Sequence, residues 1–78
     1  MLRTIRKLAA SGDDLVAEWN PETVSAERLA EIEQEFNGLM QRGYVAADIT
    51  DGRNTLVEQF DANADLLMLP KVCGGSSR

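Results

Sequence analysis

The sequence predicts a small α+β domain in which one amphipathic helix covers one face of a mixed sheet. Three observations support this prediction: a helical hydrophobic period over residues 25–42, alternating apolar residues on both sides of that segment, and a length of 78 residues. A chain this short supports one domain with one hydrophobic core. We therefore expect a single ββαβββ domain over residues 1–73 and a flexible tail over residues 74–78.

The helix is the clearest element of the chain. Its apolar residues recur at spacings of three and four positions, which places them on one face. Thr23 or Ser25 can cap the first turn, and Gly43 suits the left-handed residue that ends a helix. The apolar face consists of Leu29, Ile32, Phe36, Leu39 and Met40.

After the helix the hydrophobic period changes from helical to alternating. Residues 44–49 and residues 55–60 alternate around a turn at residues 51–54, which predicts a hairpin. A second turn over residues 61–65 leads into residues 66–72, which are apolar on both faces. A strand that is covered on both sides has this composition, so we expect residues 66–72 to form a central strand.

The first twenty residues contain one clear strand and one ambiguous segment. Residues 15–19 alternate as a strand does, and a good turn sequence precedes them. In the first segment Leu2, Ile5 and Leu8 recur every three residues, which also fits a short helix. We favour a strand over residues 2–9, because residues 15–19 need a pairing partner. The helix is the alternative.

These periods also identify the expected core. The large apolar residues of the helix and strands are just sufficient for one hydrophobic core in a chain of this length. The expected core residues are Trp19, Leu29, Ile32, Phe36, Leu39, Met40, Val57, Phe60, Leu67 and Leu69.

Composition argues against several classes of function. Thirteen acidic and eight basic residues give a net charge of −5, which disfavours binding to nucleic acid. The chain has no histidine and only one cysteine, Cys73, which excludes zinc fingers, histidine-dependent nucleophilic catalysis and an internal disulfide. A lone thiol suits a reducing compartment, and the longest strongly apolar run, residues 66–69, is far too short to span a bilayer. We expect a cytoplasmic, non-enzymatic protein that uses no cofactor and binds no membrane.

Aspartates cluster in and beside the two predicted turns, where oxygen ligands can hold calcium or magnesium. Aspartate is also preferred in turns for its own hydrogen bonds, and the spacing does not match an EF-hand loop. We therefore favour solvated turns over a metal site. The residues concerned are Asp48, Asp51, Asp61 and Asp65.

The most distinctive motif lies near the C-terminal end. Residues 64–75 contain an acidic turn, an apolar run, a proline and a glycine pair. This stretch resembles the end of ubiquitin-like β-grasp proteins, particularly the bacterial sulfur carriers, in which an adenylating enzyme activates the terminal glycine for sulfur transfer or amide formation. The resemblance implies that Gly75 is the activated residue and Gly74 its slender neighbour. It also implies that Leu69 and Val72 position the tail on the adenylating enzyme.

Two features depart from that family's pattern. Lys71 stands where a second proline is usual, and Ser76, Ser77 and Arg78 follow the glycines. Because the carboxylate of Gly75 is not free, the carrier function requires a protease to remove these three residues first. A frayed polar end without function is the alternative.

A second class of function is a small protein-interaction module, which a phage, a plasmid or an operon can encode beside its partner. Such a module needs no processing, and it would bind through an exposed strand edge or through an acidic helix face. The acidic face would consist of Glu27, Glu31 and Glu35, although a solvated helix surface is the ordinary explanation of such a row. In either class we expect a monomer or a weak homodimer.

Replacing Trp19 or Phe36 with alanine tests the expected core. Each substitution removes a large aromatic side chain from a small core, so we expect the free energy of unfolding to fall by about 3–5 kcal/mol. Urea unfolding followed by circular dichroism measures this change. An unchanged midpoint for either variant would show that the residue lies outside the core.

Overall fold

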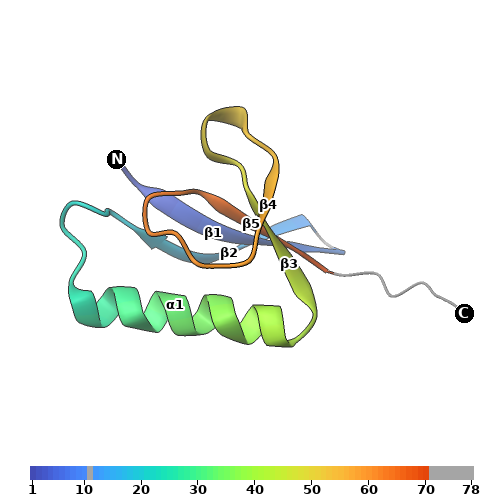
Figure 1. Cartoon of the computed structure of the whole chain (residues 1–78), viewed down its shortest axis with the longest axis horizontal. Helices are drawn as coiled ribbons and strands as arrows, with labels where there is room; N and C mark the ends of the chain where they lie inside the picture. The colour runs from blue at the N-terminus through green and yellow to red at the C-terminus, as the bar shows by residue number, and fades with distance from the viewer. Residues whose placement is uncertain (11, 71–78) are drawn as a thin grey trace, which may run out of the picture.

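One helix packs against one face of a five-stranded mixed sheet in the computed structural model (Figure 1). The α+β prediction is confirmed. The structure describes residues 1–10 and 12–70, so residues 71–72 of the last predicted strand and the predicted tail lie outside the described residues. The elements are β1 (Arg3–Ala9), β2 (Gly12–Trp19), α1 (Ala26–Gln41), β3 (Tyr44–Asp48), the 3-10 turn η1 (Thr50–Gly52), β4 (Thr55–Val57) and β5 (Leu66–Pro70).

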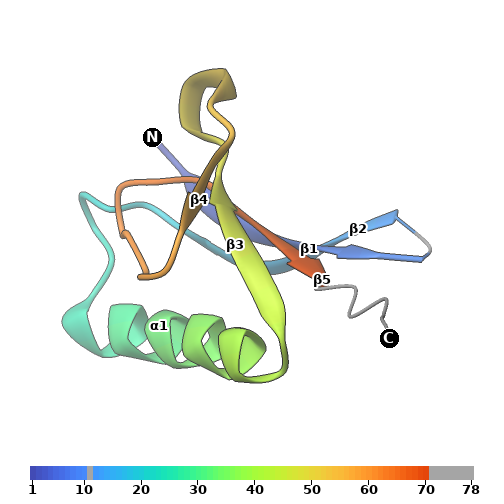
Figure 2. The same cartoon turned by 45° about the vertical axis from the view of Figure 1, so that its right-hand side comes forward.

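The last strand lies at the centre of the sheet, which has the order β2-β1-β5-β3-β4. β5 pairs in parallel with β1, where Ile5 lies opposite Leu66. On its other side β5 pairs antiparallel with β3, where Val45 lies opposite Leu69. Figures 1 and 2 show α1 running along one face of this sheet. The prediction of a central last strand is confirmed, and β2 and β4 are the outer strands.

The first segment is a strand and not a helix. β1 pairs antiparallel with β2 along its whole length. β2 begins at Gly12, earlier than the predicted residues 15–19, because the pairing continues past Lys7 opposite Asp14 to the turn. Gly12 has a φ of 122°, a conformation that glycine adopts without steric cost.

A β-bulge interrupts the register between β1 and β2. Ile5 lies opposite Ala17, whereas Arg6 lies opposite Leu15, so Val16 is an extra residue on β2. A bulge breaks the alternation of side chains along a strand. Accordingly, Val16 and Ala17 both pack on the core beneath α1, and Leu15 is 52% exposed.

Both ends of α1 lie within one residue of the predicted bounds. The Ser25 hydroxyl accepts a hydrogen bond from the backbone N–H of Arg28 at 3.1 Å, which caps the first turn. At the other end the Arg42 N–H donates to the carbonyls of Gly38 and Leu39, and Gly43 has a φ of 98°. This is the left-handed conformation expected of the residue that ends a helix.

The core lies between α1 and the sheet, and it corrects one part of the prediction. Leu67 and Leu69 were expected in the core, but Leu66 and Met68 face α1 and are 0% exposed. Successive side chains of a strand point to opposite faces, so Leu67 and Leu69 lie on the other face, where they are half-buried. The buried core cluster comprises Ile5, Ala17, Trp19, Ile32, Phe36, Leu39, Ala46, Ala64, Leu66 and Met68.

The predicted strand at residues 55–60 is too long, because β4 ends at Val57. Phe60 leaves the sheet and packs between two aromatic rings, with centroids 5.6 Å from Trp19 and 5.9 Å from Phe36. The chain must turn toward α1 to make these contacts, so residues 58–65 form a loop. Val57 and Phe60 pack on the core as expected, from different elements.

Alanine substitutions at two glycines are expected to have opposite effects on stability. Gly38 is helical and a Cβ there would meet no atom within 4 Å, so Gly38→Ala should stabilise the protein by about 0.5–1 kcal/mol. Gly43→Ala should destabilise it by about 1 kcal/mol, because alanine is strained at a φ of 98°. Urea unfolding of the two variants measures both changes. Effects of the same sign would contradict the assigned backbone conformations.

Candidate functional site

The sheet face opposite α1 carries a continuous group of apolar side chains. Leu67 and Leu69 of β5 lie on this face, and the register places Ala47 opposite Leu67 and Val45 opposite Leu69. Leu56 of β4 lies opposite Ala47 and is 69% exposed. Ala47 is buried, yet it does not belong to the core cluster beneath α1. We refer to these five residues as the open sheet face.

The open sheet face includes one residue that the sequence singled out for the tail. Leu69 lies on it next to Pro70, the exposed last residue of β5. Val72, Gly74 and Gly75 lie outside the described residues. The structure therefore brings Leu69 together with apolar neighbours from β3 and β4 just before the chain leaves β5.

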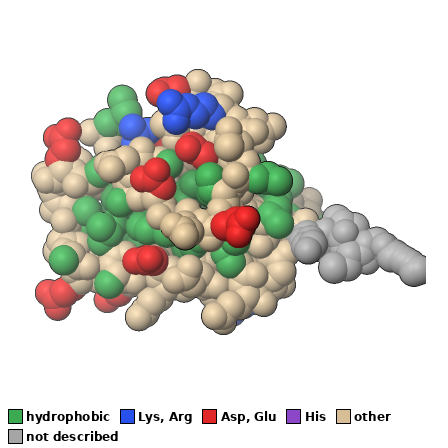
Figure 3. All heavy atoms as spheres, viewed as in Figure 1, with side chains coloured by type: hydrophobic (Ala, Val, Ile, Leu, Met, Phe, Trp, Pro, Cys, Tyr) green, Lys and Arg blue, Asp and Glu red, His purple; other side chains and the backbone are tan. Residues whose placement is uncertain are grey.

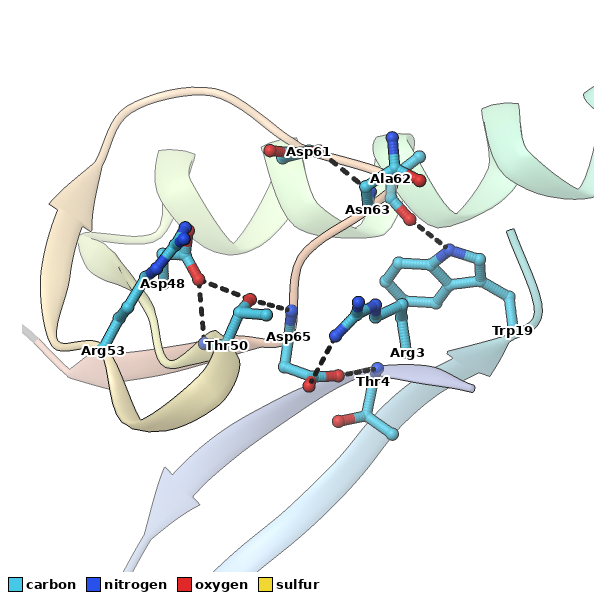
Figure 4. A network of polar contacts seen from close by, with 10 residues as sticks. All are labelled: Arg3, Thr4, Trp19, Asp48, Thr50, Arg53, Asp61, Ala62, Asn63 and Asp65. Atoms are coloured by element: carbon cyan, nitrogen blue, oxygen red, sulfur yellow. Dashed lines mark hydrogen bonds and ion pairs between the residues drawn. The ribbon is translucent and has the colours of Figure 1, made fainter. Parts of the chain in front are cut away.

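A polar network holds the start of β5 in place (Figure 4). Asp65 directly precedes β5, and its carboxylate accepts hydrogen bonds from the backbone N–H of Thr4 at 3.0 Å and from the Arg3 guanidinium at 3.3 Å. Both donors belong to β1. Asp65 therefore joins β1 to β5 where their parallel pairing begins, with Ile5 opposite Leu66.

The network continues to β3 through Thr50, which is only 6% exposed. The Thr50 hydroxyl accepts a hydrogen bond from the Asp65 N–H at 2.9 Å and donates one to Asp48 Oδ1 at 2.6 Å. The Thr50 N–H also donates to Asp48 Oδ1, at 2.9 Å. Because Asp48 ends β3, the network fixes both neighbours of β5 at the same end of the sheet.

The loop before β5 is also attached to β2. The Trp19 indole N–H donates to the Ala62 carbonyl at 2.9 Å, and the Asp61 carboxylate accepts a hydrogen bond from the Asn63 N–H at 2.8 Å. The Trp19–Ala62 contact could not be predicted from the sequence, because the two residues lie far apart in the chain and no local hydrophobic period indicates it. The Asp61–Asn63 contact is the local turn hydrogen bond expected of an aspartate.

The turn aspartates do not assemble into a metal site. Asp48, Asp61 and Asp65 each accept hydrogen bonds from the chain itself, and Asp51 is exposed with a φ of 54°. Over residues 1–10 and 12–70, no group of three or more acidic, cysteine or histidine side chains is arranged to hold a metal ion.

Only part of the acidic row on α1 lies near another element of the structure. Glu27, Glu31 and Glu35 are all exposed on α1, and Glu31 accepts a hydrogen bond from Arg28 at 3.3 Å. Glu31 and Glu35 line a groove of about 600 Å³ between α1 and the β1–β2 hairpin, whereas Glu27 lies outside it. We refer to this hollow as the α1–β2 groove. Its lining also includes Lys7, Val16, Gly38 and Arg42.

The surface mixes apolar and acidic side chains. Figure 3 shows apolar atoms exposed across the middle of one side of the molecule, with acidic side chains scattered among them. Among the residues that the structure describes, no helix is both long enough and apolar enough to cross a membrane. No protein-family model, curated protein or solved structure gives a significant match to this chain.

The polar network makes stability depend on pH through Asp48. Hydrogen bonds from the Thr50 side chain and backbone lower the pKa of the Asp48 carboxyl, and the charges of Arg53 and Arg3 contribute further. A group with a lowered folded-state pKa stabilises the protein above its ordinary pKa, about 3.9 for aspartate. That stabilisation is lost as the pH falls through the lowered value.

We therefore expect Asp48→Asn to lower the thermal midpoint at pH 7, and the difference from the unmodified protein to shrink below about pH 4. Thermal unfolding measured between pH 7 and pH 2 tests this expectation. Glu33→Gln, which changes an exposed carboxylate on α1, is the control for a general charge effect. A constant difference across the pH range would contradict the role of Asp48.

Proposed function

We propose that this protein is a small β-grasp carrier or modifier of the ubiquitin-like type and acts without catalysis of its own. It docks on an adenylating enzyme through the open sheet face and presents Gly75 after a protease has removed residues 76–78. The adenylating partner consumes ATP, so we place the protein in the cytoplasm. Four steps support the proposal.

The topology supports the β-grasp part of the proposal. A β-grasp domain requires its first and last strands to pair in parallel at the centre of a mixed sheet. Here β1 and β5 pair in that way. α1 follows the β1–β2 hairpin and packs on one face. The order of elements and the order of strands are both what the proposal needs.

The open sheet face supports the docking part. A contiguous group of apolar side chains on a small protein often marks an interaction surface. The face carries Leu56, which is among the most exposed large apolar residues of the described chain, beside the half-buried Leu67 and Leu69. A partner that covers these residues removes apolar area from water, which favours binding.

The observation on which the proposal mainly rests is the position of Leu69. It lies on the open sheet face, directly before the exposed Pro70 that ends β5. A chain advances by at most about 3.3–3.6 Å per residue, so the five residues that follow Pro70 can span at most about 18 Å. An enzyme docked on the open sheet face is therefore within reach of the Gly75 carboxylate.

The polar network supports the mechanical part. The carrier must hold the start of its tail steady while the partner acts on the end. Asp65 ties β5 to β1, and Thr50 connects it to the end of β3. β5 has a paired strand on each side up to Met68, and pairing with β3 continues to its end at Pro70.

The proposal is tested in the organism that encodes the chain, with a purification tag at the N-terminus. We expect the intact mass of the purified protein to end at Gly75, together with a thiocarboxylate or amide-linked adducts at that residue. Gly75→Val should abolish the adducts, because a branched side chain obstructs a narrow active-site channel. A protein that always retains residues 76–78 would refute the carrier function.

A second pair of variants tests the docking surface. Leu69→Asp places a charge on the open sheet face and should reduce adduct formation strongly. Leu2→Asp is the matched control, because Leu2 is an exposed leucine before β1, at the opposite end of the parallel β1–β5 pair. Circular dichroism must show that both variants are folded. Equal adduct levels in the two variants would contradict docking through the open sheet face.

A further inference from the structure

We propose that the α1–β2 groove binds an extended basic segment of a partner protein, which adds as a strand to the outer edge of β2. This inference concerns the side of the molecule beneath α1, and it does not depend on the tail or on the open sheet face. It rests on three observations: a long edge strand, an apolar floor beside it, and the sign of the charges on the edge strand.

The first observation is the edge itself. β2 is eight residues long and has β1 as a neighbour on one side only. Within the described residues no strand pairs with its outer side. An exposed edge offers backbone N–H and C=O groups to a further strand, and peptide recognition by strand addition uses this property.

The second observation is the floor of the groove. The bulge places Val16 on the same side as Ala17, and Val16 lines the groove while it remains partly buried. On the opposite wall Gly38 presents no side chain, and a Cβ at this position would meet no atom within 4 Å. Val16 and Gly38 therefore leave room for one apolar side chain of an incoming strand.

The third observation is charge. Glu31 and Glu35 stand on the helix wall of the groove. The edge strand carries the exposed Asp13, Asp14 and Glu18. The groove lining itself is balanced in charge. β2 has no basic residue, and the register places Asp13 and Glu18 on the sheet face away from α1. An added strand is therefore favoured when it presents lysine or arginine on that face.

The same charges disfavour a second copy of this chain as the occupant. Antiparallel pairing of two β2 edges would bring the acidic residues of one strand close to those of the other. Like charges on neighbouring strands are destabilising. Alternate side chains of a strand point to opposite faces. In a partner strand in which basic and apolar residues alternate, the apolar side chains can therefore meet the floor of the groove while the basic ones meet the acidic residues of the edge strand.

The probe is a short fluorescent peptide in which lysine and valine alternate, titrated into the full-length protein and followed by fluorescence anisotropy. We expect saturable binding that weakens as salt increases. Nuclear magnetic resonance with labelled protein should show the largest amide shifts in β2 and in the second half of α1. A peptide with glutamate in place of lysine should not bind.

Variants of the edge strand and of the groove test the charge contacts and the apolar contact separately. The double variant Asp13→Lys and Glu18→Lys should raise the dissociation constant of the lysine–valine peptide by tenfold or more, which corresponds to about 1.4 kcal/mol. The double variant Glu27→Lys and Glu33→Lys is the matched control, because it makes the same change in net charge on α1 outside the groove. Gly38→Leu should also weaken binding, since the new side chain fills the space above Val16.

Several results would overturn the inference. They are the absence of saturable binding, equal affinity for the glutamate peptide, an equal loss of affinity in the Glu27→Lys and Glu33→Lys control, and amide shifts centred on the open sheet face. Competition of the peptide with a dimer formed through the β2 edge, detected by sedimentation, would identify a second copy as the occupant and would also overturn it. Gly75→Val should leave peptide binding unchanged, so failure here and failure of the proposed carrier function are separate outcomes.

Discussion

The parallel pairing of β1 with β5 is the contact on which the rest of the structure depends. It joins the first strand to the last and completes the sheet between the β1–β2 hairpin and the β3–β4 pair. Asp65 reinforces this pairing where it begins, because its carboxylate accepts a hydrogen bond from the Thr4 N–H, one residue before Ile5 pairs with Leu66. Without β5 the two halves of the sheet have no shared strand, and the core loses Leu66 and Met68.

The loop before β5 makes contacts that stabilise that pairing. Trp19, Phe60 and Phe36 form a row of tilted aromatic contacts that fastens the loop to β2 and α1, and the Trp19 indole N–H satisfies the Ala62 carbonyl. Buried polar groups need partners, and Thr50 meets this need for the Asp65 N–H. Apolar and polar contacts thus hold the same segment.

Much of this architecture could be predicted from the sequence, because it follows from local periods. The helix, the number of strands and the central place of residues 66–70 all have a signal within a few residues. No local signal showed which side of β5 faces α1. Leu66 and Leu67 are both apolar, so the alternation of side chains does not indicate which of the two belongs to the core. The early end of β4 was missed because Phe60 is drawn to aromatic rings that are distant in the sequence.

The candidate surfaces could likewise be predicted only in part from the sequence. The acidic row on α1 could be recognised in the sequence. That Glu31 and Glu35 line the α1–β2 groove and Glu27 does not could not be predicted, because the groove exists only where β2 lies beside α1. The bulge at Val16 was also invisible, since one inserted residue changes the facing of a strand without changing its composition. The open sheet face became apparent only when the register set β3, β4 and β5 side by side.

The central position of the last strand has a consequence for synthesis on the ribosome. A chain that emerges from its amino end can form the β1–β2 hairpin and α1 early, because their contacts are local. The sheet cannot close until residues 66–70 are released, since β5 alone among the strands of residues 1–10 and 12–70 pairs with both β1 and β3. Pairings between distant segments are slow to form, so a nascent chain whose residues 66–70 are still inside the ribosome exposes both halves of its core.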